Sequence, residues 1–370
     1  RVIYQSESLY VSKDASSTTS GDHEELIRVQ SANYGFSINR QDVNQYGNLA
    51  RIDSLVLEAP TVNFDFSYYL GDGFNEKALG FDIISNAQFP SGFLETSSGK
   101  NFYIVTSDEG QDSVNFLPGD PYSLIGIGNA YLSDYSVDLS VGSLPTATVS
   151  FEGANISSSN GTIVGTQPSN ARMVSDSPAI DIEEGTPIGT QVNILKPKNT
   201  GQDGPTALRP GDIYITFPGF DDDNSALARI SGDGKFNLQS ANLSVPLSRS
   251  PIERLGSKFP FARVVDFPVN ASLSVNAIVS EQETRDLSAL VSGCSSSDGA
   301  VRITMQSCDG QDTLIWNLLG ATLDSESYSS SVGSNKTVDL SFGVQLGGVD
   351  DVENGILCSG SGQFRPVFVD

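Results

Sequence analysis

The chain contains a single histidine, His23, among its 370 residues. A Ser-His-Asp or Cys-His catalytic arrangement would have to be built on this one side chain, which lies in the hydrophilic stretch SSTTSGDHEE. Common zinc sites need several cysteines or histidines together, and none are placed for one. No P-loop and no dinucleotide-binding motif is present either. The sequence therefore predicts no catalytic residue, no bound metal and no cofactor, and it favours a protein that is not an enzyme.

Basic residues are also scarce. Lysine and arginine number 21 against 45 aspartates and glutamates, which gives a net charge of −24. This balance argues against a basic face that binds nucleic acid. The acidic residues are scattered, as on a solvated surface, but they would also suit a surface past which a polyanion moves without sticking. Both interpretations are open at this point.

The chain has few cysteines and no long apolar run. An odd number of cysteines without close spacing argues against a disulfide framework or a metal knuckle. Cys294 and Cys308 could pair if their strands adjoin, but reduced thiols are favoured for these two and for Cys358. No segment of 18 or more apolar residues could span a membrane, so no membrane partner is expected.

Several blocks of the sequence occur twice. The stretch VQSANYGFSINRQDVNQYG, Val29 to Gly47, returns without a gap as LQSANLSVPLSRSPIERLG, Leu238 to Gly256. Further blocks follow in the same order: Thr61–Leu70 with Asn270–Val279, Glu109–Val114 with Asp309–Leu314, and Ala130–Phe151 with Ala321–Phe342, the last identical at 10 of 22 positions. Collinear blocks predict a duplicated domain. We expect one copy at residues 1–156 and the other at 207–370. The Ser-, Gly- and Pro-rich residues 157–206 would be a connection or a small insertion.

Alternation of apolar and polar residues predicts the secondary structure. Runs such as NFDFSYYL, KNFYIVT, LSVNAIV and TVDLSFGVQL have a period of two, which is typical of strands with one buried face. One short helix is expected in each copy, within Gly71–Phe81 and within Ser280–Val291, where Ser280 and Glu283 have capping-box spacing. The predicted fold class is mainly β, with two tandem β-sandwich or β-barrel domains.

The run YGFSINRQDVNQYGNLARIDSLVLEAPTVNFDFSYYLGDGFNEKALGF, Tyr34 to Phe81, resembles the opening of tail tube (major tail) proteins of tailed bacteriophages. In that family a strand, a long hairpin, a second strand and an alternating third strand lead into a short helix. The resemblance implies a structural virion protein without enzymatic activity. It would self-assemble into stacked rings, with three two-domain subunits giving a pseudo-sixfold ring. The rings would form the hollow tail tube through which DNA passes.

The resemblance also implies partners and a location. The partners would be further copies of the chain, the tape measure, tail terminator and distal tail proteins, and genomic DNA in transit without specific binding. Assembly would take place in the host cytoplasm, and the product would be part of the virion. The connection at residues 157–206 is larger than the family pattern leads one to expect.

Candidate site residues follow from alternation and from the repeat. Val62–Leu70 and Ala271–Val279 would form the inner barrel, since a one-residue slip would turn every apolar side chain into the channel. The polar positions between them are the candidates for facing the lumen: Asn63, Asp65, Ser67, Ser272, Ser274 and Asn276. Two long hairpins, Ile38–Ile52 and Leu247–Val264, would reach toward the adjacent ring. Arg40 and Arg249 recur at the same place in them, either as inter-ring contacts or simply as residues that flank a turn.

Two other functions stay open on the sequence alone. A secreted or cell-surface β-sandwich protein, such as an adhesin or a carbohydrate-binding protein, would have a similar Ser-, Thr-, Gly- and Asn-rich acidic composition. A glycoside hydrolase would need two paired carboxylates, and nothing singles out two among 45 acidic residues. Particle size separates the first alternative from a tube protein, because a binding module stays small.

Overall fold

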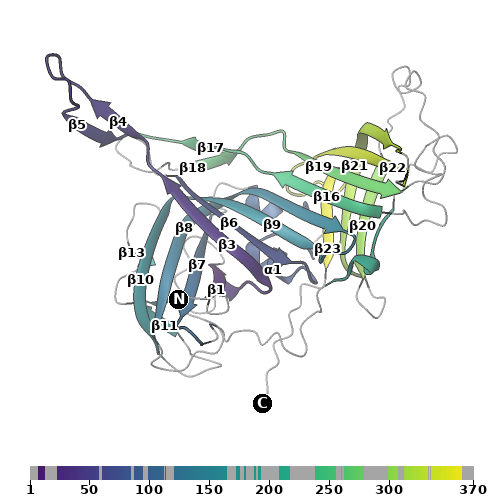
Figure 1. Cartoon of the computed structure of the whole chain (residues 1–370), viewed down its shortest axis with the longest axis horizontal. Helices are drawn as coiled ribbons and strands as arrows, with labels where there is room; N and C mark the ends of the chain where they lie inside the picture. The colour runs from purple at the N-terminus through teal and green to yellow at the C-terminus, as the bar shows by residue number, and fades with distance from the viewer. Residues whose placement is uncertain are drawn as a thin grey trace.

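A computed structural model shows a mainly β chain with one short α-helix among the residues that it describes (Figure 1). These residues are 7–12, 23–57, 61–84, 87–94, 99–111, 113, 121–164, 172–175, 179–180, 187–188, 191–192, 208–216, 238–255, 260, 262–278, 299–306, 312–331, 333 and 335–360. The prediction of a mainly β fold is confirmed. The helix expected within Ser280–Val291 and the residues Cys294 and Cys308 lie outside the described residues.

The first half of the chain has two sheets that share one long strand, β8. One sheet contains β1, β7, the first part of β8 and β10, and the other contains β3, β6, β9 and the second part of β8. The helix α1, Phe74–Leu79, lies within the predicted stretch Gly71–Phe81, and the 3-10 helix η2 covers Ser91–Phe93. The strands are Glu7–Ser12 (β1), His23–Glu25 (β2), Val29–Ser37 (β3), Arg40–Val43 (β4), Asp53–Val56 (β5), Thr61–Tyr69 (β6), Lys100–Ser107 (β7), Pro121–Ser140 (β8), Thr146–Gly153 (β9) and Asn155–Val164 (β10).

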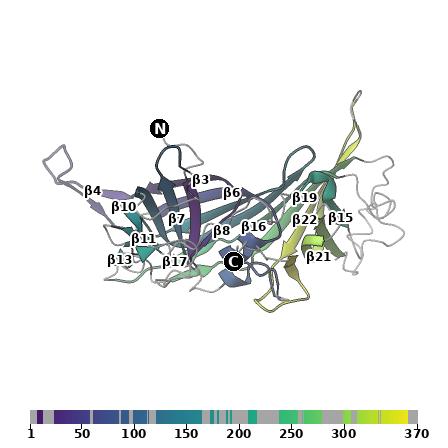
Figure 2. The ribbon, with the colours of Figure 1, turned by 90° about the horizontal axis from the view of Figure 1, so that it is seen from below.

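The second half has a matching order of strands and lies beside the first (Figure 2). Its elements are the 3-10 helix Pro210–Asp212 (η3) and the strands Ile213–Thr216 (β15), Leu238–Pro246 (β16), Arg249–Ile252 (β17), Ala262–Val265 (β18), Asn270–Ile278 (β19), Gly299–Gln306 (β20), Asp312–Ser329 (β21), Thr337–Gln345 (β22) and Gly355–Gly360 (β23). Four short strands precede them: Arg172–Ser175 (β11), Ala179–Ile180 (β12), Pro187–Ile188 (β13) and Gln191–Val192 (β14). Residues 157–164 of the expected connection belong to β10, which pairs with β8.

Each half contains one long strand that passes from one sheet into the other. The first part of β8 pairs with β7 and β10, and its second part pairs with β9. In the same way β21 pairs first with β20 and β23 and then with β22. Between the two parts lie Asn129 in β8, with φ 46, and Gly320 in β21, with φ 65. Asn and Gly tolerate this left-handed backbone better than other residues, so both strands can change direction at this point.

The two halves also pair their strands in the same register. Val29 lies opposite Tyr68 between β3 and β6, with an irregularity before Ser31; in the second half, Leu238 lies opposite Ala277 with the irregularity at the same place. The hairpins match as well, since Arg40 faces Val56 in one and Arg249 faces Val265 in the other. The aligned blocks therefore have matching strand pairings in the two halves.

Eight strands of the two halves form one continuous antiparallel ladder. Its order is β3-β6-β9-β8-β16-β19-β22-β21, four strands from each half. The halves join where β8 pairs with β16, from Ser140 opposite Ser240 to Asp134 opposite Pro246. We call these eight strands the joined sheet. Within the described residues, β3 and the second part of β21 are its two edges.

Apolar residues of both halves pack into one continuous core. In the first half the core contains a cluster of rings, in which the ring centroid of Phe66 lies 5.6 Å from that of Phe102 and 6.1 Å from that of Phe151. The loop after α1 reaches the second half, where the Phe89 N–H donates to the Ile356 oxygen at 2.7 Å. The buried Gln88 side chain accepts a hydrogen bond from the Ile356 N–H at 3.1 Å. The joined sheet and this loop therefore hold the halves together.

Candidate functional site

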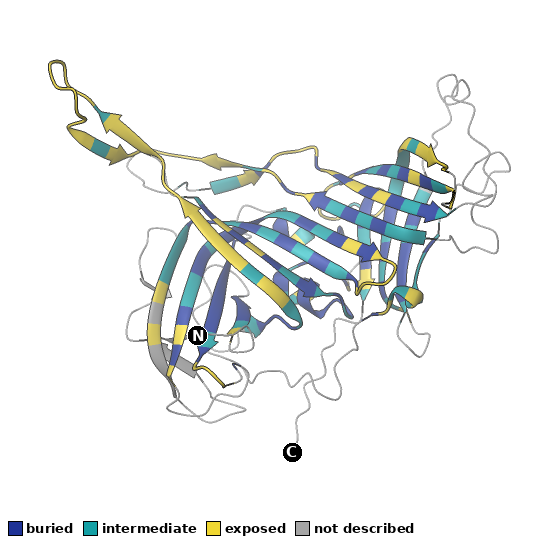
Figure 3. Cartoon of the chain, viewed as in Figure 1, coloured by how far each residue is buried: buried dark blue, intermediate teal, exposed yellow. Residues whose placement is uncertain are grey.

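Along most strands of the joined sheet, buried residues alternate with more exposed ones, so the sheet has one buried face and one open face (Figure 3). In β6 the residues Val62, Phe64, Phe66 and Tyr68 are almost completely buried, whereas Asn63 and Asp65 between them are exposed. The strands β9, β8, β16, β19 and β22 continue this alternation along most of their paired length. At the two edges, β3 and the second part of β21 contain no buried residue. The apolar face packs on the core, and the second face points away from it.

We call this second face the polar face, and its residue types are restricted. It consists mainly of Ser, Thr, Asn and Asp: Ser31 and Asn33 of β3; Asn63, Asp65 and Ser67 of β6; Thr146, Thr148, Ser150 and Glu152 of β9; Asp134, Ser136, Asp138 and Ser140 of β8; Ser240, Asn242 and Ser244 of β16; Ser272, Ser274 and Asn276 of β19; Thr337, Asp339 and Ser341 of β22; and Ser325, Ser327 and Ser329 of β21. None of the eight strands contains a lysine or an arginine.

Asparagine amides hold the carboxylates of the polar face across strand pairs. The Asn33 Nδ2 donates to Asp65 at 3.0 Å, and the Asn276 Nδ2 donates to Asp339 at 2.6 Å. At the joint between the halves, the Asn242 Nδ2 donates to Asp138 at 2.5 Å. An amide donor orients a carboxylate without neutralising its charge, so these contacts leave the face negative.

Asp134 is a half-buried carboxylate of the polar face. It lies beside the joint, where Ser244 of β16 donates to it at 3.5 Å. Burial raises the pKa of the Asp134 carboxyl above its ordinary value, and the hydrogen bond from Ser244 acts against this rise.

All six residues predicted to face a lumen lie on the polar face. Asn63, Asp65, Ser272 and Ser274 are exposed, while Ser67 and Asn276 are half-buried. The structure brings both sets onto one surface, because β8 and β16 join the two halves. Sequence reasoning missed the contributions of β3, β8, β9, β16, β21 and β22 to this face. The sequence did contain a signal for β8: the alternation within the Ala130–Phe151 block places Asp134, Ser136, Asp138 and Ser140 on the same face.

Arg249 lies at the joint between the halves and makes its contacts within the chain. Its guanidinium carbon lies 5.1 Å from the centroid of the Tyr131 ring, and the guanidinium donates hydrogen bonds to the main-chain oxygens of Phe93 and, at 3.3 Å, Arg263. Burial lowers the pKa of Arg249 to about 10. Beside it, Arg263 forms an ion pair of 3.0 Å with Glu152 at the end of the polar face. Both arginines come from the β17–β18 hairpin, outside the eight strands.

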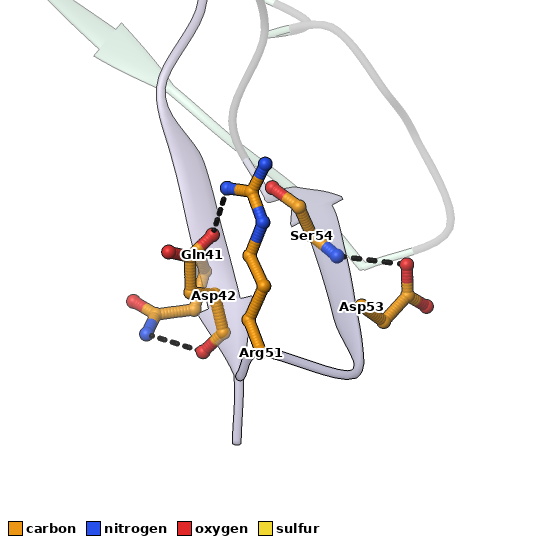
Figure 4. A network of polar contacts seen from close by, with 5 residues as sticks. All are labelled: Gln41, Asp42, Arg51, Asp53 and Ser54. Atoms are coloured by element: carbon orange, nitrogen blue, oxygen red, sulfur yellow. Dashed lines mark hydrogen bonds and ion pairs between the residues drawn. The ribbon is translucent and has the colours of Figure 1, made fainter. Parts of the chain in front are cut away.

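Arg40 occupies the corresponding position in the first half but has different surroundings. It is exposed, at the base of the β4–β5 hairpin that projects away from both halves (Figure 1). Tyr46 and Leu49 are fully exposed at the hairpin's turn. Figure 4 shows the hairpin's own polar contacts, in which the Arg51 guanidinium lies 2.9 Å from the Asp42 carboxylate. The hairpin therefore presents an apolar tip and a set of local polar contacts to its surroundings.

Metal and membrane features can be assessed for the described part of the chain. No group of three or more His, Cys, Asp or Glu residues is placed there to hold a metal ion. Cys358 is a buried free thiol. No helix in the same residues is long and apolar enough to cross a membrane.

Comparison with known proteins gives only partial likenesses. No family model matches the chain, and no curated protein matches it. The AFP tube terminating cap of the anti-feeding prophage is 8% identical over 42% of this chain and 93% of that one, with a TM-score of 0.30. The PVC sheath–tube complex of an extracellular contractile injection system, in its extended state, is 10% identical over 40% of this chain and 88% of that one, with a TM-score of 0.28. The anti-feeding prophage baseplate is 15% identical over 40% of this chain and 91% of that one, with a TM-score of 0.26. Likenesses at this level carry no argument about function.

Proposed function

We propose that the chain is a structural protein of a phage tail or a related particle, and that copies of it assemble into stacked rings around a channel for DNA. The observation that carries the proposal is the joined sheet. It runs without a break through both halves, one face is buried in the core, and the other is a polar face without lysine or arginine in its strands. A wall of this kind, closed on itself, would separate a polar channel from an apolar protein core.

The repeated register explains how a ring could arise from one chain. We take the chain to be a duplication, with each half supplying four strands to the channel wall. A contact that repeats between unlike surfaces closes into a ring when the rotation between neighbours is right. Three chains would then give a ring of six similar domains. Closure also pairs every edge strand, which removes the hazard of uncontrolled pairing.

The chemistry of the polar face suits passage of a polyanion. Proteins hold DNA mainly through lysine and arginine contacts with phosphates, and these contacts are missing from the eight strands. Hydroxyl and amide groups keep the wall wetted, and the carboxylates Asp65, Asp138 and Asp339 repel phosphates. The six candidates Asn63, Asp65, Ser67, Ser272, Ser274 and Asn276 would be among the residues that DNA passes.

The remaining parts of the proposal concern stacking and partners. The projecting β4–β5 hairpin, with Arg40 at its base, would contact the next ring. Arg249 would instead stabilise the joint between the halves, since its guanidinium already contacts Tyr131 and Phe93. Ends of the tube would bind a tail terminator and a distal tail protein, and the channel would hold a tape measure before DNA. The three partly similar structures come from an anti-feeding prophage and an extracellular contractile injection system, but the proposal does not rest on them.

Assembly of the purified chain tests the proposal. Sedimentation velocity and negative-stain electron microscopy should show rings or hollow tubes made of this protein alone, rather than particles of about 39.3 kDa. A protein that remains monomeric at all concentrations and ionic strengths contradicts the proposal. That result would favour the β-sandwich adhesin or carbohydrate-binding alternative.

A further inference from the structure

Equivalent residues of β3 and β16 differ sharply in exposure. In β16, Leu243 and Val245 are 1% and 0% exposed, and Leu247 beyond the strand is 0% exposed. Their aligned residues in the first half are Tyr34 at 45%, Phe36 at 61% and Ile38 at 39%. The residues have the same place in the same ladder register, so the difference comes from what lies next to each strand.

The neighbour that covers β16 is β8. These strands pair from Ser140 to Asp134, and the Leu247 N–H extends the contact by donating to the Ser133 oxygen at 2.8 Å. Within the described residues, β3 pairs with β6 alone and so lacks such a neighbour. An unpaired strand with large apolar side chains is a template for another strand.

The opposite edge of the joined sheet offers the matching strand. The second part of β21 is aligned with the second part of β8, and within the described residues it pairs with β22 alone. Tyr328, which corresponds to Val137 of β8, is 46% exposed, whereas Val137 is 1% exposed and lies opposite Leu243. Each end of the sheet therefore exposes one partner of a contact that the middle of the same sheet already shows.

We infer that β21 of one chain pairs antiparallel with β3 of a second copy, in the register of the β8–β16 joint. This inference rests on the proposed function and names the interface that would close the ring. Carrying the register of the joint over to the aligned residues gives the following pairs between chains: Ser325 with Ser37, Glu326 with Phe36, Ser327 with Gly35, Tyr328 with Tyr34, and Ser329 with Asn33.

Two of the inferred pairs, one on each side of the sheet, have suitable chemistry. Tyr34 and Tyr328 meet on the core side, where each covers apolar surface of the other, and aromatic cross-strand pairs stabilise antiparallel sheets. Asn33 and Ser329 meet on the other side and continue the polar face without a basic residue. The Ile38 N–H would donate to the Asp324 oxygen, as the Leu247 N–H does to Ser133. Pairing of two β3 edges, or of two β21 edges, would give closed dimers instead of a ring.

Disulfide trapping tests the register. Asn33→Cys and Ser329→Cys are combined in one chain, both at exposed positions of the monomer. The matched control combines Asn33→Cys with Ser325→Cys, four residues away on β21 and beyond disulfide reach in the inferred register. The native cysteines are the same in both proteins. Each preparation is oxidised, run on a non-reducing gel and imaged by electron microscopy, and circular dichroism checks that both variants are folded.

The expected result is a ladder of covalent oligomers for the first pair and at least tenfold less cross-linking for the control. Mixing the two single variants should give covalent dimers only, while neither single variant alone should cross-link. Covalent dimers from Asn33→Cys alone would show β3 pairing with β3 and overturn the inference.

The proposed function and this inference can fail separately. Rings or tubes that form while the two pairs cross-link equally weakly would overturn the inference and leave the proposed function standing. Cross-links in the inferred register that join copies into linear oligomers, without rings, would support the inference and count against ring formation. Folded monomers without cross-links would overturn both.

Discussion

Phe64 and Asp65 are neighbours in the sequence but face opposite environments. The Phe64 side chain is 1% exposed, and its ring centroid lies 5.0 Å from that of Phe102, whereas Asp65 is exposed and accepts a hydrogen bond from Asn33. At the scale of single residues, this alternation decides what a substitution costs. A charge on the core side must be buried, while a change on the polar face meets water.

We expect Phe64→Asp to prevent folding or assembly. Loss of a buried phenylalanine ring alone costs about 3–5 kcal/mol, and an unpaired buried carboxylate adds to this. The sum is comparable to the whole stability of an ordinary domain, about 5–15 kcal/mol. Asp65→Asn should leave the thermal unfolding temperature and the assembled particles unchanged. Soluble yield, circular dichroism and electron microscopy are the measurements, and normal particles from Phe64→Asp with none from Asp65→Asn would show that the faces are assigned wrongly.

Glu76 is a buried carboxyl at the boundary between the halves. It accepts hydrogen bonds from the Tyr68 hydroxyl at 2.9 Å and the Tyr135 hydroxyl at 3.2 Å, and burial raises its pKa. A carboxyl whose pKa is higher in the folded than in the unfolded state binds its proton more tightly when folded. Its contribution to stability is therefore fully present below the unfolded pKa, and it is lost as the pH rises through the folded pKa.

Glu76→Gln should reveal this loss. The glutamine does not titrate, so the unfolding temperature of the native protein minus that of the variant should fall as the pH rises from about 4.5, the ordinary range of a glutamate, toward neutrality. Thermal unfolding of both proteins at matched pH measures the difference. A difference that stays constant or grows with pH would show that burial does not raise the Glu76 pKa.

At the scale of elements, the same strand has a different role in the two halves. In the second half, β16 is an interior strand of the joined sheet, while in the first half β3 is an edge. The same change at equivalent positions should therefore affect folding in one strand and assembly in the other.

We expect Leu243→Asp to unfold the chain and Tyr34→Asp to leave it folded but unable to assemble. Leu243 is 1% exposed, so its replacement buries a carboxylate, whereas a surface change such as Tyr34→Asp usually alters stability by about 0.5 kcal/mol or less. Unfolding temperature and sedimentation velocity measure the two effects. Equal loss of stability in both variants would show that Tyr34 is not at an open edge.

The β4–β5 hairpin projects from the molecule and should act in stacking. Replacing residues 44–52 by Asn-Gly would join Val43 to Asp53, which already face each other, through a favoured two-residue turn. We expect the shortened chain to form single rings instead of tubes, because the exposed Tyr46 and Leu49 are removed. Electron microscopy distinguishes rings from tubes. Tubes of ordinary length from the shortened protein would rule out a stacking role for the hairpin tip.

At the scale of the whole molecule, the net charge is −24 and the strands of the joined sheet contain no basic residue, so both features disfavour the binding of DNA phosphates. The halves share a core and a sheet, so each chain would present its polar face as one wall. In a closed ring this wall would enclose the channel, and its charge would decide whether DNA is held or passes.

Ser274→Lys places a basic residue in the middle of this wall, where Ser274 is exposed. Assembled variant particles should bind a short labelled single-stranded DNA in a manner that weakens as salt rises, because binding releases counterions from phosphates. Native particles, and particles of Ser274→Asn, should not bind it at low salt. Fluorescence anisotropy against salt concentration is the measurement. Binding by the native particles would contradict a channel that lets DNA pass without holding it.

Alternation in the sequence was enough to place individual side chains on one face or the other. Val62, Phe64 and Phe66 are buried as their period of two requires, and the short helix forms within the predicted Gly71–Phe81, because both features depend on residues close in the chain. The aligned blocks also predicted matching positions, such as Arg40 and Arg249 at the start of β4 and β17.

What the tertiary structure alone decided is which strands lie next to each other across the halves. Period and propensity do not specify the partner of an edge strand, so the β8–β16 joint could not be read from the sequence, nor could the single polar face that it creates. For the same reason Arg40 and Arg249 are alike in sequence and different in environment. Arg249 is half-buried against Tyr131 because β16 has a neighbour within the chain, and Arg40 is exposed because β3 has none among the described residues.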